Sequence, residues 1–190
     1  MRKAGIMENL TDAMLVVRMK AGDQEAFAEL YNRYKTLIYR TACLISGNAA
    51  DGEDIMQETF LKAYLHCGEL RSDERFQYWL LRILNRTAWA MLKKIRQEFP
   101  DEHATEKAEA ENNLLTEHIL LQKEQYNEVF QAVMQLKYKL RIVVILYYYD
   151  GMHTKEIAKT IECREGTVKS RLFTARIRLK ELLKHKNIEI

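Results

Sequence analysis

Three carboxylates recur on one side of the stretch DGEDIMQETFLKAY, which begins at Asp51. At 100° per residue, Asp51, Asp54 and Glu58 lie within about 60° of one another on a helix, with Leu61 and Leu65 beside them. Clustered carboxylates are suitable ligands for a metal ion, but no His stands at the spacing of a Glu-x-x-His set. Two interpretations remain open. The stretch is a solvated acidic face, or it is a docking surface for a basic partner helix, with the leucines supplying apolar area.

A second surface combines cations with aromatic rings. On a helix that begins at Glu74, one side about 100° wide carries these residues: Tyr78, Arg82, Asn85, Arg86, Trp89, Lys93 and Arg96. The opposite side is mostly apolar and holds Phe76, Leu80, Ile83, Leu84, Thr87 and Met91. Rings that stack on bases, next to cations that neutralise phosphates, are typical of surfaces that bind single-stranded or melting nucleic acid. The alternative is that Tyr78 and Trp89 are only the edge of a core.

The segment EIAKTIECREGTVKSRLFTARIRLK, which begins at Glu156, predicts a helix-turn-helix with helices over 154–161 and 165–185. A buried stripe of the second helix is expected at Val168, Leu172, Ala175, Leu179 and Leu182. The outer face then presents Lys169, Ser170, Phe173, Thr174, Ile177 and Lys180, with Arg176 and Arg178 at its margins. Such a mixture of cations, hydroxyls and apolar groups suits the major groove of DNA. The alternative is a charged surface helix whose Phe173 and Ile177 pack on a neighbour.

Catalytic chemistry has no equivalent pattern in the sequence. There is no His/Cys/Asp/Ser constellation, Gly-rich phosphate loop or HExxH motif, so we expect no enzymatic activity and no cofactor. Cys43, Cys67 and Cys163 are scattered and form no CxxC, which favours packing roles over a disulfide framework or a zinc site. No apolar run reaches the ~18 residues of a membrane span, and no signal sequence is evident at the start, so the expected location is the cytoplasm.

These surfaces must be positioned by helices. The chain of 190 residues is 47% hydrophobic and 30% charged, with 7 Gly and a single Pro, which predicts an all-α fold of two small helical domains. Asp23 is the expected N-cap of the second helix, and Gly47 and Gly68 are expected breaks. The helices are expected over 8–20, 24–46, 51–66 and 74–97, and then over 114–136, 138–149, 154–161 and 165–185.

The distribution of charge separates the two expected domains. Residues 71–98 carry seven Lys or Arg against three Asp or Glu, residues 100–125 two against seven, and residues 164–186 eight against two. The acidic stretch from Pro100 has almost no large apolar side chain before Leu114, and it is therefore expected to be an extended linker over 100–113. The expected domains are 1–99 and 114–190.

The chain resembles the extracytoplasmic-function sigma factors of bacterial RNA polymerase. The resemblance rests on the order and spacing of three stretches: DGEDIMQETFLKAY, FQYWLLRILNRTAWAMLKK and EIAKTIECREGTVKSRLFTARIRLK. The resemblance implies a sigma region 2 domain, which binds core polymerase and melts the minus-10 element, and a sigma region 4 domain, which reads the minus-35 element. The implied partners are core RNA polymerase, through its β′ clamp helices and β flap, promoter DNA, and an anti-sigma factor that in this family is commonly membrane-tethered.

The resemblance also implies roles for individual residues. The polymerase contacts would be Asp51, Asp54, Gln57 and Glu58. The minus-10 contacts by motif position would be Lys62, His66, Leu70, Arg86 and Ala90, to which the basic-aromatic face adds Arg82, Trp89 and Lys93. The minus-35 contacts would be Lys169, Ser170, Arg171 and Thr174, to which the outer face adds Phe173 and Arg176.

Four of these positions depart from the family pattern. The family usually has Asn at Arg86, often Asp or Asn at Ala90, commonly an aromatic residue at Leu70, and often Arg at Thr174. These departures point to a promoter that differs from the usual one. The alternative function is a stand-alone helix-turn-helix regulator, which would have no use for the acidic face or for the first basic face.

Overall fold

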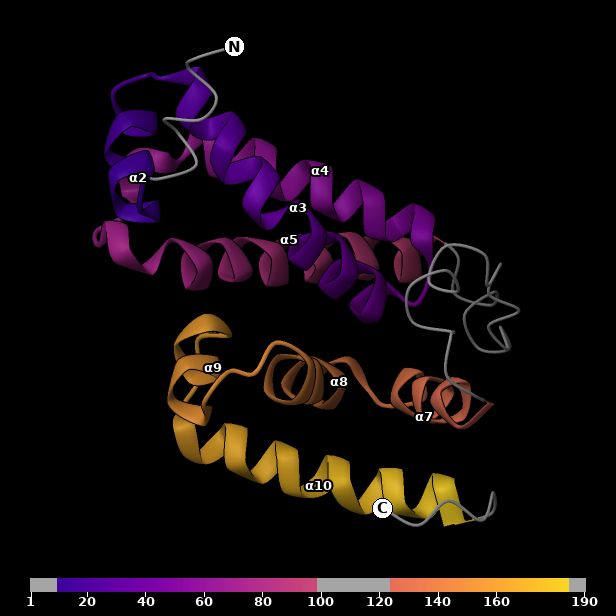
Figure 1. The fold of residues 1–190 in the computed structure, drawn as a ribbon. Helices are drawn as coiled ribbons and strands as arrows, with labels where there is room; N and C mark the ends of the chain where they lie inside the picture. Colours follow the sequence, from indigo (N-terminus) through magenta and orange to yellow (C-terminus); the bar gives the residue numbers. More distant parts are fainter. Residues whose placement is uncertain (1–9, 99–123, 185–190) are drawn as a thin grey trace.

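Two layers of helices make up the described parts of the chain, residues 10–98 and 124–184 of a computed structural model (Figure 1). The first layer consists of α2 (Asp12–Lys20), α3 (Gln24–Ser46), α4 (Ala49–Leu65), the 3-10 turns η1 (Cys67–Glu69) and η2 (Asp73–Arg75), and α5 (Phe76–Glu98). The second consists of α7 (Glu124–Met134), α8 (Tyr138–Val144), the π-helical turn η4 (Ile145–Tyr149), α9 (Thr154–Thr160) and α10 (Glu165–Lys184). All regular secondary structure in these residues is helical, which confirms the all-α prediction.

Side-chain caps set where the first three helices begin. The Asp23 carboxylate accepts hydrogen bonds from the backbone N–H groups of Glu25 and Ala26 at 3.0 and 3.2 Å, which confirms it as the N-cap of α3. Gly47 ends α3 at φ 94°, a conformation that glycine adopts without strain. Thr11 caps α2, so this helix begins at Asp12 and not at residue 8 as predicted.

Two other predicted boundaries need correction or lie outside the described residues. The helix predicted over 138–149 ends in the wider turn η4, in which the N–H of Asp150 donates to the carbonyl of Ile145 at 3.1 Å. The predicted linker 100–113 and the start of the helix predicted at residue 114 lie outside the described residues.

Close packing of α3 against α4 forms the centre of the first layer. Ile38 and Ile45 of α3 and Ile55 of α4 are fully buried, together with Leu80 and Leu84 of α5. At the α3–α4 crossing, a Cβ at Gly52 would lie 2.4 Å from the Sγ of Cys43 and 3.0 Å from its Cα. Only glycine therefore permits this approach of the two backbones.

The two layers share one hydrophobic cluster, which runs from Leu15 in α2 to Leu172 in α10. Along this seam α5 contacts α9, and α3 contacts α8 and η4. Thr41 of α3 donates a hydrogen bond to Asp150 at 3.0 Å. Tyr138 of α8 donates to the Asn85 carbonyl and side-chain oxygens at 3.1 and 2.9 Å. In this structure the surfaces predicted from the sequence therefore lie on two layers that are packed against each other.

Candidate nucleic-acid interface

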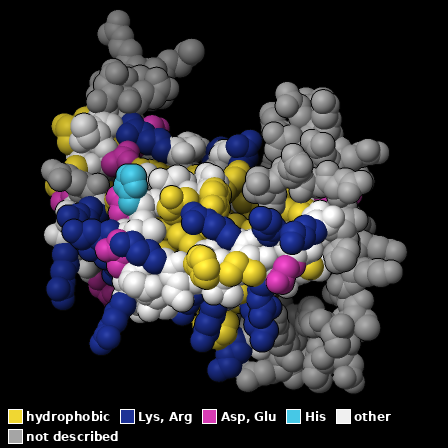
Figure 2. Space-filling view, turned by 90° about the horizontal axis from the view of Figure 1, so that it is seen from below, with side chains coloured by type: hydrophobic (Ala, Val, Ile, Leu, Met, Phe, Trp, Pro, Cys, Tyr) yellow, Lys and Arg dark blue, Asp and Glu magenta, His cyan; other side chains and the backbone are white. Residues whose placement is uncertain are grey.

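Helix α10 separates a buried stripe from an exposed face, as the sequence predicts. Val168, Leu172 and Ala175 are buried, whereas in the last turn the buried residue is Leu183 and Leu182 is only half-buried. The side chain of Phe173 is 65% exposed, which rules out the packing alternative for this residue within the described chain. Figure 2, a view from the α10 side, shows Lys and Arg side chains around hydrophobic ones on this face.

The cations of this exposed face are differently constrained. Lys169 pairs with Glu165 one turn earlier at 2.9 Å, an exposed ion pair that a phosphate can replace at small cost. Arg176 is held more firmly, because its Nε donates to the Tyr148 hydroxyl at 2.8 Å and its guanidinium lies 5.9 and 5.8 Å from the ring centres of Tyr147 and Tyr148. Ser170 is exposed, Arg171 is half-buried, and Thr174 bonds back to the Ser170 carbonyl at 3.0 Å.

Helix α5 presents the predicted basic-aromatic face toward the second layer. Phe76, Leu80, Leu84 and Thr87 are buried on its other side, which confirms the angular prediction for these four residues. Five predicted site residues line or flank this face: Arg82, Arg86, Trp89, Ala90 and Lys93. Of these only Arg82 is half-buried and the other four are exposed.

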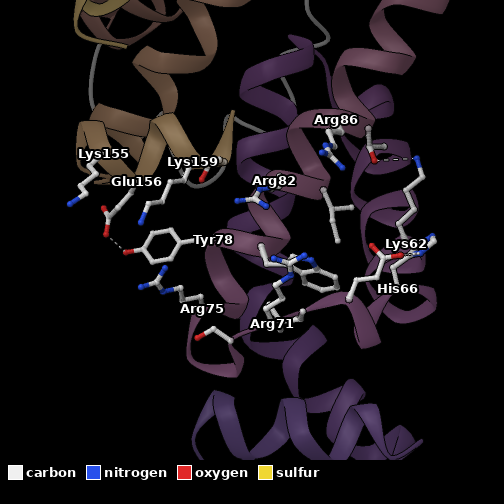
Figure 3. Close-up of a pocket in the computed structure, with 17 residues that line it drawn as sticks. Lys62, His66, Arg71, Arg75, Tyr78, Arg82, Arg86, Lys155, Glu156 and Lys159 are labelled. Atoms are coloured by element: carbon white, nitrogen blue, oxygen red, sulfur yellow. Dashed lines mark hydrogen bonds and ion pairs between the residues drawn. The ribbon is translucent and has the colours of Figure 1, made fainter. Parts of the chain in front are cut away.

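A cleft of about 1070 Å³ lies between α5 and α9 (Figure 3). Lys155, Glu156 and Lys159 of α9 face it from one side, and Arg82 and Arg86 of α5 face it from the other. The remaining predicted minus-10 residues that line it are Lys62, His66 and Leu70. The structure therefore brings together five of the eight predicted minus-10 residues in one basic cleft, which also includes two lysines of the second layer.

Interactions within the cleft hold some of these side chains and leave one unsatisfied. Lys62 donates to the Thr87 hydroxyl at 3.3 Å and pairs with Glu58 at 3.1 Å, and His66 lies 3.0 Å from Glu69. The buried Nε of Arg82 has no hydrogen-bond partner.

Leu70 is a special case among the predicted minus-10 residues. Its side chain is only 5% exposed and belongs to the hydrophobic cluster, although it forms part of the cleft wall. Its carbonyl accepts a hydrogen bond from Lys20 at 2.7 Å, which fixes the loop after α4. In this conformation Leu70 offers little surface to a ligand.

The sequence did not single out Glu156, Glu162 and Tyr138, which reach α5 from the second layer. Glu156 accepts a hydrogen bond from Tyr78, which lowers the pKa of this carboxyl, and Glu162 accepts one from Arg86, which lowers its pKa as well. The Tyr138 ring lies 5.0 Å from that of Trp89. The period of a single helix does not predict such contacts, because they join residues that are 49 to 78 positions apart in the sequence.

The acidic face of α4 lies on the surface. Asp54 and Gln57 are exposed, Asp51 and Glu58 are half-buried, and Leu61 and Leu65 are 53% and 65% exposed. Asp51 also interacts with the N-cap Asn48, whose side chain accepts from its N–H and donates to its carboxylate, both at 2.8 Å. Among the described residues no cluster of three or more His, Cys, Asp or Glu is arranged to hold a metal ion.

Comparison with known proteins places this arrangement in a family. Residues 30–98 match the sequence family described as sigma-70 region 2, and residues 126–179 match sigma-70, region 4. The ECF RNA polymerase sigma-E factors of Salmonella typhimurium and Escherichia coli are each 35% identical over 179 residues, which is 89% of this chain and 92% of the relative. The chain belongs to the extracytoplasmic-function subfamily of sigma-70 factors.

Further relatives agree with this membership. The ECF RNA polymerase sigma factor SigW of Bacillus subtilis is 29% identical over 180 residues, covering 89% of this chain and 95% of that protein. The fold resembles that of CnrH in complex with the cytosolic domain of CnrY, with a TM-score of 0.68, 21% identity and coverage of 92% and 97% of the two chains. It also resembles RpoE of Bartonella quintana in complex with NepR, with a TM-score of 0.65, 24% identity and coverage of 83% and 96%.

The family settles the broad function. The chain is a transcription initiation factor that directs RNA polymerase to promoters, and sigma factors are not enzymes. The alternative of a stand-alone helix-turn-helix regulator is wrong, because it does not account for the region 2 match over residues 30–98. No helix in the described residues has the length and hydropathy that crossing a membrane requires.

Proposed function

We propose that the three surfaces divide the work of promoter recognition. The acidic face of α4 binds core polymerase through Asp51, Asp54, Gln57 and Glu58, on the β′ clamp helices. Residues 1–99 would form this region 2 domain, 100–113 the linker, and 114–190 a region 4 domain that also contacts the β flap. The exposed Leu61 and Leu65 beside these carboxylates support the docking assignment, because they supply the apolar area that a charged surface alone lacks.

The basic cleft and the α5 face are proposed to bind and open the minus-10 element. The residues are Lys62, His66, Leu70, Arg82, Arg86, Trp89, Ala90 and Lys93. The cations that line the cleft favour an anionic ligand, and the exposed ring of Trp89 gives an unstacked base a surface to pack on. Ala90 can supply only an apolar contact.

The exposed face of α10 is proposed to read the minus-35 element in the major groove. The residues are Lys169, Ser170, Arg171, Phe173, Thr174 and Arg176. The observation that carries the proposal is the exposure of Phe173 between Lys169 and Arg176 on a helix whose opposite side is buried. A large apolar side chain at this place is costly to leave in water, and it suits contact with a thymine methyl group.

Two further features of the proposal follow from the comparisons. The similar structures contain CnrH bound to the cytosolic domain of CnrY and RpoE bound to the anti-sigma factor NepR. We therefore expect this chain to bind an anti-sigma factor. The cytosolic domain of CnrY is the model for a partner that is itself anchored to a membrane. The place of action would be the cytoplasm, where RNA polymerase works.

Run-off transcription with purified core polymerase on a promoter library tests the minus-35 assignment. The replacements Lys169→Ala and Arg171→Ala are expected to weaken the preference at one or two minus-35 positions, by about 5- to 150-fold where a base contact is lost. Glu181→Gln, an exposed change on the same helix, serves as the control. An unchanged minus-35 preference in both alanine variants would show that α10 does not read the DNA.

A further inference from the structure

The guanidinium of Arg176 on α10 is held by two tyrosines of the turn η4. Its Nε donates a hydrogen bond to the Tyr148 hydroxyl at 2.8 Å, and its central carbon lies 5.9 and 5.8 Å from the ring centres of Tyr147 and Tyr148. The two rings meet edge to face, with centres 4.9 Å apart and planes at 77°. Arg176 is therefore oriented by one hydrogen bond and two rings that lie outside its own helix.

This arrangement orders the Arg176 side chain without neutralising its charge. Both tyrosines are uncharged near neutral pH, and in the described parts of the chain Arg176 makes no ion pair with a carboxylate. Lys169, on the same exposed face, is instead paired with Glu165 at 2.9 Å. A phosphate must displace that carboxylate to reach Lys169, whereas it meets the full positive charge of Arg176 directly.

The position of Arg176 along α10 suits contact with the DNA backbone. It follows Lys169 by seven residues, so the two lie about 20° apart around the helix axis and about 10 Å apart along it. In helix-turn-helix proteins the first residues of this helix contact base edges, and its later part approaches the phosphates. A hydrogen bond at Nε leaves the Nη donors of this exposed side chain for a phosphate oxygen.

Burial does not account for Tyr148. Its side chain is 58% exposed, although Leu146, two residues earlier, is fully buried. The hydrogen bond to Arg176 is exposed, and such bonds add little to stability because water replaces them. The buried Val168 and Leu172 already attach α10 to its half of the molecule. What the Tyr148 hydroxyl determines is the direction of the guanidinium.

We propose that Tyr148 is a positioning residue for promoter recognition, which holds Arg176 in the orientation that binds one phosphate of the minus-35 element. The proposal rests on the proposed function of the α10 face. An arginine that is ordered before binding loses less entropy in the complex, so affinity rises without a further contact to DNA. A phosphate contact of this kind sets the register of α10 in the groove and carries no sequence information of its own.

A double-mutant cycle on the full chain tests the positioning. The four proteins are the unchanged chain, Tyr148→Phe, Arg176→Ala and the double variant, each with saturating core polymerase. Phenylalanine keeps the ring at position 148 and removes only the hydroxyl to which Arg176 donates. Fluorescence anisotropy measures the affinity for labelled promoters selected from the transcription library, at several salt concentrations, and thermal unfolding is followed in parallel.

The expected result is that Tyr148→Phe weakens promoter binding about 2- to 5-fold, and has no further effect once position 176 is alanine. Arg176→Ala is expected to reduce the slope of log affinity against log salt by about one, because one phosphate contact is lost. Both single variants are expected to weaken binding to all selected promoters alike. The thermal midpoint of Tyr148→Phe stays unchanged, whereas the loss of a purely structural contact would lower it.

Tyr149→Phe is the matched control. It removes the neighbouring hydroxyl of the same turn, which interacts with Arg40 of α3, and it is expected to leave promoter affinity unchanged. Equal weakening by the two Tyr→Phe changes would overturn the positioning role.

Other outcomes separate the positioning role from the assignment of α10 to DNA. If Arg176→Ala weakens binding and Tyr148→Phe does not, or if the effect of Tyr148→Phe persists in the double variant, positioning is excluded and the assignment of α10 stands. If Arg176→Ala and Lys169→Ala both leave promoter binding unchanged, the assignment of α10 fails, and the role of Tyr148 fails with it.

Discussion

Leu172 and Phe173 are neighbours in the sequence, yet they lie in opposite environments on α10. Leu172 is buried in the shared hydrophobic cluster, whereas Phe173 is largely exposed. Leu172→Asp is expected to lower the free energy of unfolding by at least about 3 kcal/mol, because it removes core contacts and buries an unpaired carboxylate. Thermal unfolding followed by circular dichroism measures this loss.

The same substitution one residue later is the control. Phe173→Asp is expected to change the free energy of unfolding by less than about 0.5 kcal/mol, because its side chain is surrounded mainly by solvent. Equal destabilisation by the two variants would contradict the division of α10 into a core stripe and an exposed face.

Residue by residue, the sequence predicts such contrasts well where a helix has one buried side. The stripe through Val168, Leu172 and Ala175 follows from a period of 3.6 residues. The prediction fails at the end of α10, where Leu183 is buried in place of Leu182. Both are leucines, so composition does not distinguish them, and the choice depends on the helices that pack there.

At the scale of the elements, the crossing of α3 and α4 depends on Gly52. Gly52→Ala is expected to destabilise the protein by about 1–3 kcal/mol, although alanine is the better helix former by about 1 kcal/mol. The added Cβ meets backbone atoms of Cys43 at 3.0 Å, and backbone moves less easily than a side-chain end. Chemical denaturation gives the difference in the free energy of unfolding.

Gly68→Ala is the matched change, since a Cβ at Gly68 meets no atom within 4 Å. It is expected to leave stability unchanged or slightly raised. A Gly52→Ala variant as stable as Gly68→Ala would show that the two helices separate at little cost.

The outer side of α4 gives an element-scale prediction of binding. Asp54→Lys with Glu58→Lys is expected to weaken the affinity for core polymerase by at least about 10-fold, because like charges would then face a basic partner. Glu25→Lys with Glu181→Lys makes the same change in net charge elsewhere on the surface. Competition for core enzyme measures both double variants, and equal affinities would exclude α4 as the docking element.

Helix boundaries were predictable where the sequence analysis recognised the cap or the glycine that marks them, as for α3, and not where it missed the cap, as at Thr11 of α2. Asp23 and Gly47 bound α3 at Gln24–Ser46, which confirms the predicted range 24–46. The turn η4 was not predictable, because a π-turn uses the same apolar residues as an α-helix and differs only in its hydrogen bonds. Because of the turn η4, Asp150 lies beside Thr41 at the seam between the two layers.

At the scale of the whole molecule, the sequence predicted two helical halves but not how they meet. A buried stripe on one helix shows that it packs, and does not show which partner it packs on. The seam is formed by particular pairs such as Tyr138–Asn85 and Thr41–Asp150, each from distant parts of the chain. Local periodicity carries no information on such pairs.

Asp150 makes closure of the seam depend on pH. Burial raises the pKa of this carboxyl to about 7, against a smaller opposing effect of the hydrogen bond from Thr41, and its second oxygen has no hydrogen-bond partner. Tyr149 of η4 lies near Asp150 and also near Arg40 and Cys43 of α3, and it forms a hydrogen bond with Arg40. Opening the seam would expose Asp150 to water and return its pKa toward 3.8.

The sign of the effect follows from this difference in pKa. Below about pH 4 the carboxyl is protonated in both states, so it contributes no dependence on pH. Between about pH 4 and 7 the open form loses its proton first, and closure is weakened by on the order of 1 kcal/mol for each pH unit. Above about pH 7 both forms are ionised, and the effect levels off.

Asp150→Asn removes this titration while keeping an oxygen that accepts the Thr41 hydrogen bond. The unchanged chain is expected to expand as the pH rises from 5 to 8, and the variant to stay compact across the same range, because its amide carries no charge to desolvate. Small-angle scattering at several pH values measures both proteins. A chain that expands identically with and without Asp150 would place the pH dependence elsewhere, whereas one that never expands would show that the packed seam outweighs the buried charge.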